Sequence, residues 1–106
     1  VHPGGIQTNL GRHMTPEMQE ALIKRVTTSD SGFAWKTIPQ GAATTCWAAT
    51  AVELEGRGGV YCEDCHVAEV DDESASGGVR SYALNPSYAE RLWALSEDLT
   101  GVKFPS

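Results

Sequence analysis

The chain has 106 residues, with 14 acidic and 8 basic side chains and a formal net charge of −6 at pH 7. A chain of this length forms one domain at most, near the lower size limit for a single hydrophobic core. The negative charge disfavours nucleic acid and anionic membrane surfaces as partners. No apolar run reaches membrane-spanning length, and no signal peptide is recognisable. Three cysteines do not make a disulfide framework, so we expect a reducing cytoplasm.

The first ten residues combine an apolar start with a proline, two adjacent glycines and a hydroxyl side chain. Pro3 fixes its own φ and lacks an N–H, whereas Gly4 and Gly5 allow positive φ and a close approach of the backbone. Ile6 and Thr8 follow. This pattern is typical of a strand that ends in a tight loop, with backbone N–H groups and a hydroxyl facing a ligand. Ordinary turns use the same residues, so the pattern alone leaves the ligand open.

Residues 15–26 are predicted to form an amphipathic helix. Thr15 suits the N-cap, Pro16 the first helical position, and Glu17 the positive end of the helix dipole. A polar loop at residues 27–31 and an aromatic connector at residues 32–35 follow. The predicted apolar face consists of Met18, Ala21, Leu22 and Val26.

The second predicted helix begins at a capping box and runs to about Thr50. Thr37 is the N-cap and Gln40 is its partner at the third helical position. The small residues along this helix would allow it to pack closely against a sheet or another helix. Residues 52–57 are expected to end the helix in a turn, and residues 59–62 to form a short strand.

The last forty residues are predicted to form an acidic loop and then a helix. Residues 67–78 are small and acidic, which is typical of a solvated loop. Asn85 and Pro86 suit the N-cap and first position of the final helix, and Gly101 suits its C-terminal cap. Ala89, Leu92, Trp93 and Leu99 form the apolar stripe, with Trp93 expected to anchor a core.

The sequence Cys-Glu-Asp-Cys-His at residues 62–66 offers a different chemistry. C-x-x-C-H is the attachment pattern of c-type haem, and a C-x-x-C pair is also half of a zinc site or a redox pair. Haem would need an axial ligand such as Met14 or Met18, and zinc would need two further ligands, for which Cys46 and the other histidines remain. The two acids between the cysteines disfavour a reactive thiolate. We therefore expect structural thiols and no metal ligand.

The order of these segments resembles short-chain dehydrogenases/reductases, most closely the retinol-dehydrogenase-like and WW-domain-oxidoreductase-like branch. Residues 1–10 resemble the loop that follows the sixth strand of that family. The resemblance runs from Val1 to about Val102 and corresponds to the last third of such an enzyme. Further matching segments are residues 40–45, 58–61, 63–65, 82–84 and 91–93.

The resemblance implies an α/β fold, in which residues 1–106 form a single C-terminal segment. This segment would be the C-terminal portion of a Rossmann-type, doubly wound parallel sheet, with helices and the last strand present and the nucleotide-binding half absent. The last strand, at residues 59–62, would lie beside the strand that ends at Val1. Two family motifs, the glycine-rich nucleotide loop and the Tyr-x-x-x-Lys pair, are absent from the sequence.

The resemblance also implies a binding site for NAD or NADP in the complete enzyme. Pro3, Gly4 and the backbone of Ile6 would lie against the nicotinamide, and Thr8 would bond its carboxamide or the nearby diphosphate. Four further residues would line or cover the mouth of the substrate site: Met14, Met18, Phe33 and Trp35. Core packing is an equally simple role for the methionines and aromatics.

The function implied is therefore part of an oxidoreductase for an alcohol or carbonyl substrate. Because no tyrosine precedes Lys24, Lys36 or Lys103 by four positions, we assign no catalytic residue. The chain alone is expected to bind no cofactor tightly and to be inactive. The alternative is a non-catalytic interaction module that self-associates or pairs with the missing N-terminal part; a haem or metal module is a weaker one. The expected partner is a second copy of the chain (a homo-oligomer) or the missing N-terminal part, without nucleic acid or membrane.

Overall fold

The computed structural model describes residues 1–28, 33–74 and 76–105. Three α-helices, three short 3-10 helices and one small β-hairpin are found in these residues. Most of the predicted loop at residues 27–31, and the first residue of the connector at residues 32–35, lie outside the described residues. The α-helices are α1 (Pro16–Thr28), α2 (Ile38–Thr50) and α3 (Pro86–Thr100), the 3-10 helices η1 (Asn9–His13), η2 (Val52–Leu54) and η3 (Ser81–Leu84), and the strands β1 (Cys62–Glu63) and β2 (His66–Val67).

The three predicted α-helices are confirmed, together with the N-caps of α2 and α3 and the C-cap of α3. In α2 the Thr37 side chain accepts from the Gln40 N–H while the Gln40 side chain accepts from the Thr37 N–H, which completes the capping box. The Asn85 side chain caps α3, whose C-cap, Gly101, has a φ of 69°. Helix α1 extends to Thr28, two residues beyond its predicted end.

The N-terminal segment lies between Lys36, which precedes the N-cap of α2, and strand β1. The His2 N–H donates to the Cys62 carbonyl at 2.8 Å, and His2 forms a parallel bridge with Glu63. On the other side, the Lys36 N–H donates to the Gly5 carbonyl at 2.8 Å. The segment therefore lies beside the later strand, as the sequence predicted.

The predicted strand at residues 59–62 is wrong in its bounds, and its hairpin partner was not predicted. Strand β1 begins only at Cys62, because Gly59 has a φ of 73°, which is incompatible with extended backbone. Strands β1 and β2 pair antiparallel through a turn at Asp64 and Cys65, whose φ values of 46° and 59° match a type I′ hairpin. Among the described residues, parallel pairing is limited to isolated bridges, so these residues do not form a doubly wound sheet.

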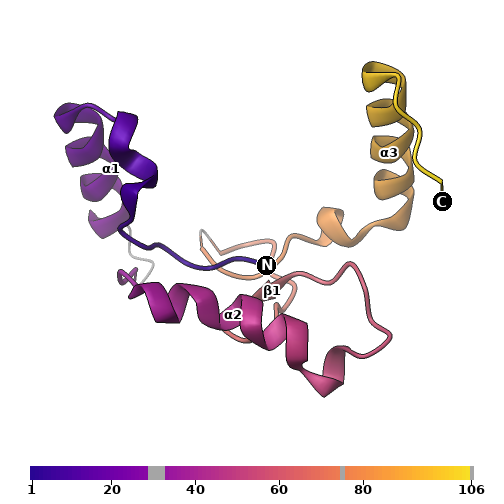
Figure 1. The fold of residues 1–106 in the computed structure, drawn as a ribbon, viewed down its shortest axis with the longest axis horizontal. Helices are drawn as coiled ribbons and strands as arrows, with labels where there is room; N and C mark the ends of the chain where they lie inside the picture. Colours follow the sequence, from indigo (N-terminus) through magenta and orange to yellow (C-terminus); the bar gives the residue numbers. More distant parts are fainter. Residues whose placement is uncertain (29–32, 75, 106) are drawn as a thin grey trace.

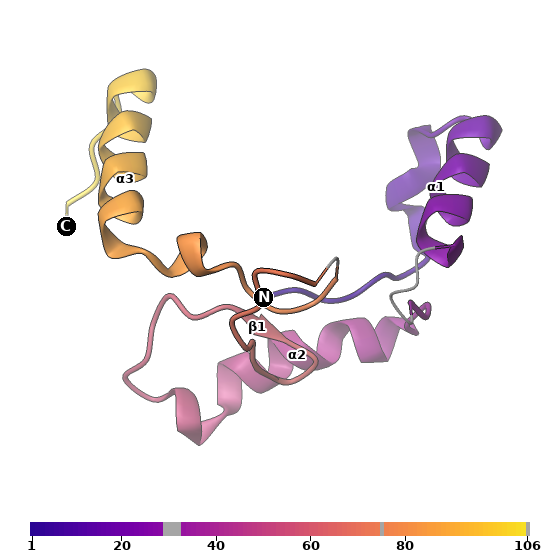
Figure 2. The same ribbon diagram turned by 180° about the vertical axis from the view of Figure 1, so that it is seen from behind.

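Helices α1 and α3 stand at opposite ends of the molecule, on either side of the region formed by α2 and the hairpin (Figures 1 and 2). The radius of gyration is 17.0 Å, whereas a compact domain of this length has about 13 Å. The small core lies between α2, the hairpin and the loop that follows it. Its buried residues are Gly41, Thr44, Cys62, Ala68 and Val79.

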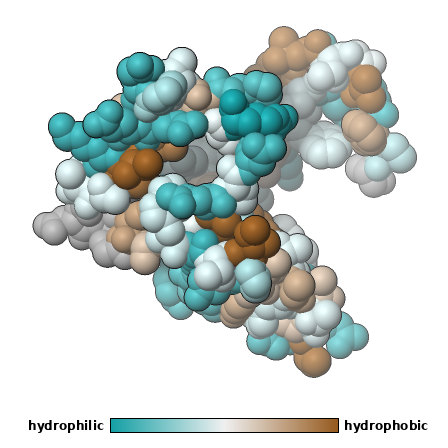
Figure 3. Space-filling view, turned by 60° about the vertical axis from the view of Figure 1, so that its left-hand side comes forward, coloured by the Kyte–Doolittle hydropathy of each residue, from teal (hydrophilic) through white to brown (hydrophobic). Residues whose placement is uncertain are grey.

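Much apolar surface is open to solvent. The accessible surface is 8551 Å², about 2,800 Å² more than a folded monomer of this mass exposes. Hydrophobic side chains lie at the surface in several separate places (Figure 3). Trp93, predicted to anchor a core, is 55% exposed and contacts Phe104 edge-on. That prediction is wrong for this chain, because α3 has no buried residue. None of the described helices combines the length and apolar composition that a bilayer crossing requires.

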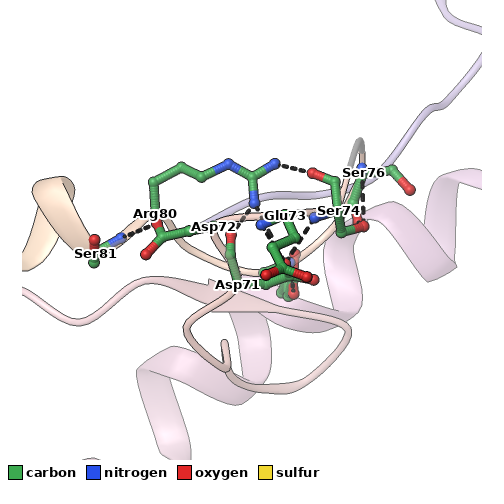
Figure 4. Close-up of polar contacts among 9 residues, drawn as sticks. Asp71, Asp72, Glu73, Ser74, Ser76, Arg80 and Ser81 are labelled. Carbon is green, nitrogen blue, oxygen red and sulfur yellow. Dashed lines mark hydrogen bonds and ion pairs between the residues drawn. The ribbon is translucent and has the colours of Figure 1, made fainter.

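The acidic loop is fastened by its own side chains (Figure 4). The Asp71 carboxylate accepts from the N–H groups of Glu73 and Ser74 at 2.9 and 2.8 Å, and the Asp72 carboxylate accepts from the Ser81 N–H at 2.9 Å. The Arg80 guanidinium donates to the carbonyls of Asp71 and Ser74. These backbone donors lower the pKa of both aspartates, with smaller contributions from Arg80.

We predict that this loop loosens in acid. A carboxyl group whose pKa is lower in the folded state stabilises that state above its unfolded pKa, which is about 3.9 for aspartate. The contribution is lost as the pH falls through the lowered pKa. Amide chemical shifts of Ser74 and Ser81 should therefore change together below about pH 4. In Asp71→Asn, which keeps an acceptor oxygen but does not ionise, the Ser74 shift should be insensitive to acid. The same titration in both proteins would contradict the assignment.

We also predict that the isolated 106-residue chain is ordered only in an assembly. Leu92, Leu95 and Leu99 on α3 are 63%, 52% and 78% exposed, and burying each such side chain stabilises a protein by roughly 1.5–3 kcal/mol. Sedimentation equilibrium at micromolar concentration should show a dimer or larger species, or a poorly ordered chain. A compact monomer with a cooperative thermal transition would show that the chain closes its own core.

Candidate functional site

A cavity of about 760 Å³ lies between the N-terminal segment, η1, α1 and the aromatic connector. Its described wall contains no lysine, histidine, tyrosine or carboxylate, so these residues can bind and orient a ligand but cannot exchange a proton with it at neutral pH. The wall is formed by Gly4, Gly5, Ile6, Gln7, Thr8, Asn9, Leu10, Gly11, Arg12, Met14, Gln19, Leu22, Ile23, Val26, Phe33 and Trp35.

Close contacts fix the course of the N-terminal segment along this cavity. A Cβ atom on Gly5 would lie 2.7 Å from the Phe33 ring, so only glycine allows the ring to pack there. On the other side, a Cβ atom on Gly41 would lie 2.6 Å from the Ile6 side chain, so the absence of a side chain lets Ile6 sit directly on α2. The segment is therefore held between the aromatic connector and the start of α2.

Thr8 turns the chain from this segment into η1 and α1. Its hydroxyl oxygen accepts from the Leu10 N–H at 3.2 Å and so caps η1. The Thr8 hydroxyl hydrogen has no acceptor among the described residues, and the side chain lines the cavity. The Gln19 side chain donates to the Gly11 carbonyl at 3.4 Å, which links α1 to η1.

Two aromatic side chains also line the cavity. The rings of Phe33 and Trp35 meet edge to face, with centroids 5.1 Å apart. Trp35 is 37% exposed, so the ring is available to a ligand as well as to its neighbour. Lys36, the residue after Trp35, does not line the cavity. In extended backbone, successive side chains point to opposite sides, which accounts for this difference.

The structure brings together six of the eight residues predicted for the cofactor and substrate sites. Pro3 and Met18 are the two that do not line the cavity. Met18 is 55% exposed. The face of α1 that lines the cavity shares Leu22 and Val26 with the predicted face, but contains Gln19 and Ile23 in place of Met18 and Ala21. Neither placement tests the role of a residue in binding. The six that line the cavity are Gly4, Ile6, Thr8, Met14, Phe33 and Trp35.

The sequence reasoning missed several residues of the wall. Gln19, Leu22, Ile23 and Val26 occur at helical spacings of three, one and three, which place them on one side of α1. The apolar spacing from Leu22 to Val26 was visible in the sequence, but Gln19 is polar and was not counted. Arg12 also lines the cavity, where its guanidinium donates to the Asn9 carbonyl at 3.2 Å.

The cysteine motif lies in the hairpin, away from the cavity. Cys62 is buried, whereas Cys65 is exposed in the turn and its N–H donates to the Thr44 hydroxyl at 3.1 Å. Within the described residues, no three histidine, cysteine, aspartate or glutamate side chains are grouped as a metal site would require. The motif forms the turn between β1 and β2, which gives its residues a structural role.

Comparison with known proteins identifies the family. The chain is 41% identical over 96 residues to short-chain dehydrogenase TIC 32 B, chloroplastic, of Brassica napus, and 42% identical over 97 residues to short-chain dehydrogenase/reductase prx1 of Penicillium roqueforti. It is 33% identical over 102 residues to human retinol dehydrogenase 14. These alignments cover 91%, 89% and 96% of the chain. The chain belongs to the short-chain dehydrogenase/reductase family.

The chain spans about a quarter of the length of these relatives: 25%, 27% and 27%. It corresponds to a C-terminal segment of the family, as the sequence predicted. No protein-family model matches the chain, and no solved structure matches it. The incomplete sheet and the exposed helices agree with this short coverage, because the elements that would cover them belong to the rest of the domain.

We predict that Thr44 holds the hairpin on α2. Thr44 is 1% exposed, and its hydroxyl is the acceptor for the Cys65 N–H. Thr44→Val keeps the shape but leaves this donor unpaired, which should lower the free energy of unfolding by about 1–3 kcal/mol. Thr44→Ser, which keeps the hydroxyl, is the control. Equal urea midpoints for Val and wild type would contradict this role.

Proposed function

We propose that this segment closes the nicotinamide site and forms part of the substrate mouth of an NAD(P)-dependent dehydrogenase/reductase for an alcohol or carbonyl compound. The observation that supports it best is the single cavity shared by the N-terminal loop and the α1 region. Gly4, Ile6 and Thr8 line this cavity together with Met14, Phe33 and Trp35. A bound nicotinamide and its substrate must be neighbours for hydride transfer, so one shared cavity suits this chemistry.

The charges of the wall suit an anionic cofactor. Arg12 is the one ionised side chain on the described part of the wall. Thr8 adds a hydroxyl, whose oxygen is occupied by the Leu10 N–H while its hydrogen is available to a ligand oxygen. A guanidinium and a hydroxyl donor are what a diphosphate or a carboxamide oxygen requires.

The chemical step is assigned to the part of the enzyme that this chain lacks. No residue of the described wall can exchange the substrate proton at neutral pH, and the sequence contains no Tyr-x-x-x-Lys pair. In this proposal the cofactor supplies the hydride, and the chain supplies position, apolar surface and exclusion of water.

In this proposal, the exposed apolar faces of the helices bind the N-terminal part of the domain or a second copy of the chain. The exposed apolar side chains of α3 and the large accessible surface support this association. A non-catalytic interaction module is the second candidate, and the same exposed surface favours it. We also propose a cytoplasmic location, since three cysteines in the sequence do not make a disulfide framework.

We predict that Thr8→Val weakens cofactor binding in the complete enzyme more than it weakens substrate binding. Losing one hydrogen bond to the cofactor costs about 0.5–1.5 kcal/mol, or roughly two- to tenfold in KM. Thr8→Ser is the matched control, since it keeps both the cap on Leu10 and the donor. An unchanged cofactor KM in Thr8→Val would exclude the proposed bond.

We further predict that the isolated chain has no oxidoreductase activity with NADH or NADPH. The assay is a change in absorbance at the nicotinamide band, over a panel of aldehydes, ketones and alcohols. The complete protein should be active in the same panel, which separates an inactive segment from a wrong substrate class. Turnover by the isolated chain above a buffer blank would contradict the proposal that the chemical step needs residues outside this chain.

A further inference from the structure

The residue that adjoins Gly4 most closely does not line the cavity. A Cβ atom on Gly4 would lie 2.7 Å from the Lys36 Cδ atom and 2.8 Å from its Cε atom. The methylene chain of Lys36 therefore occupies the space beside Gly4 that a side chain would need. Gly4 has a φ of 85°, so both the backbone conformation and this contact require glycine.

Lys36 holds this position through bonds at both of its ends. Its N–H donates to the Gly5 carbonyl at 2.8 Å. Its ammonium group forms an ion pair with the Asp64 carboxylate, at the tip of the β1–β2 turn. The hydrogen bond from Lys36 is the largest cause of the lowered pKa of Asp64.

The turn that carries Asp64 is itself anchored. The next residue, Cys65, donates its N–H to the buried Thr44 hydroxyl of α2. The chain just before Gly4 and Gly5 is held to the same hairpin by the bond from the His2 N–H to the Cys62 carbonyl. Asp64 is therefore a charge on a fixed support, which reduces the side-chain entropy that an exposed ion pair normally loses.

Two adjacent glycines are the most conformationally free pair in a chain, and a loop built from them needs restraint from outside. From this arrangement we infer that Lys36 and Asp64 are positioning residues, which act on the cofactor through Gly4 and Gly5. The ion pair holds the Lys36 stem against Gly4 and so fixes the wall that the nicotinamide ring would meet. This inference rests on the proposed function, because it assigns a bound nicotinamide to that wall.

The experiment uses the complete protein, with NADH and NADPH as the probes. Lys36→Met keeps a similar methylene stem and removes the charge, and Asp64→Asn keeps the shape of the carboxylate partner. Each should raise the Kd of the preferred cofactor by about two- to fivefold, the range of an exposed ion pair. The KM of the carbonyl or alcohol substrate should stay within error.

The double variant Lys36→Met/Asp64→Asn should bind no more weakly than either single variant, because both changes break one interaction. One molar salt should reduce the difference between wild type and variants, since screening acts on the ion pair and not on packing. Lys36→Arg should retain most of the affinity. Lys24→Met, an exposed change on α1, is the control for loss of one positive charge.

Hydrogen exchange of residues 3–6 in the cofactor-free protein gives the second readout. Faster exchange in Lys36→Met and Asp64→Asn, with normal exchange in Lys24→Met, supports the inference. Cofactor binding that is unchanged in both variants, or additive losses in the double variant, overturns it. If the wild-type protein binds neither NADH nor NADPH, the proposed function is wrong, and so is the cofactor role of Lys36 and Asp64. Faster exchange in the variants of such a protein would show that the ion pair only orders the loop.

Discussion

The structure depends on how the N-terminal segment is held between two neighbours. The bond from the His2 N–H to the Cys62 carbonyl holds its start on β1, and the bond from the Lys36 N–H to the Gly5 carbonyl holds its end beside the N-cap of α2. Backbone groups along such a segment need partners wherever water is excluded. Because both sides of the segment are occupied, its course past the cavity is set before any ligand is present.

The parts of the chain on either side of this segment differ in how well they are buried. The hairpin, Thr44 and the acidic loop form a small supported region, whereas α1 and α3 extend from it with no buried residue. Helices that keep apolar faces in solvent are not independent units, since tertiary burial supplies most helical stability. The family membership gives the physical reason: relatives are three to four times as long, at 25–34% coverage, and hold the rest of the domain.

Helix boundaries were predictable from sequence because their signals are local. The capping box of Thr37 and Gln40 and the Gly101 C-cap depend on residues only a few positions apart. The pairing of Lys36 with Asp64 joins residues 28 positions apart, and no pattern in the sequence specifies it. The turn was missed because its positive φ values fall on Asp64 and Cys65 and not on glycine. Met18 was misplaced by one position on a helix whose partner is absent.

The central claim is that the wall formed by the N-terminal segment contacts the nicotinamide. Nuclear Overhauser effects in the complete protein, between the nicotinamide ring protons and methyl groups labelled at Ile6, Thr8 and Met14, test it most directly. The account predicts contacts to the Ile6 and Thr8 methyl groups at saturating cofactor, since both line the cavity. Bound cofactor whose ring protons show no effect at either residue would contradict it.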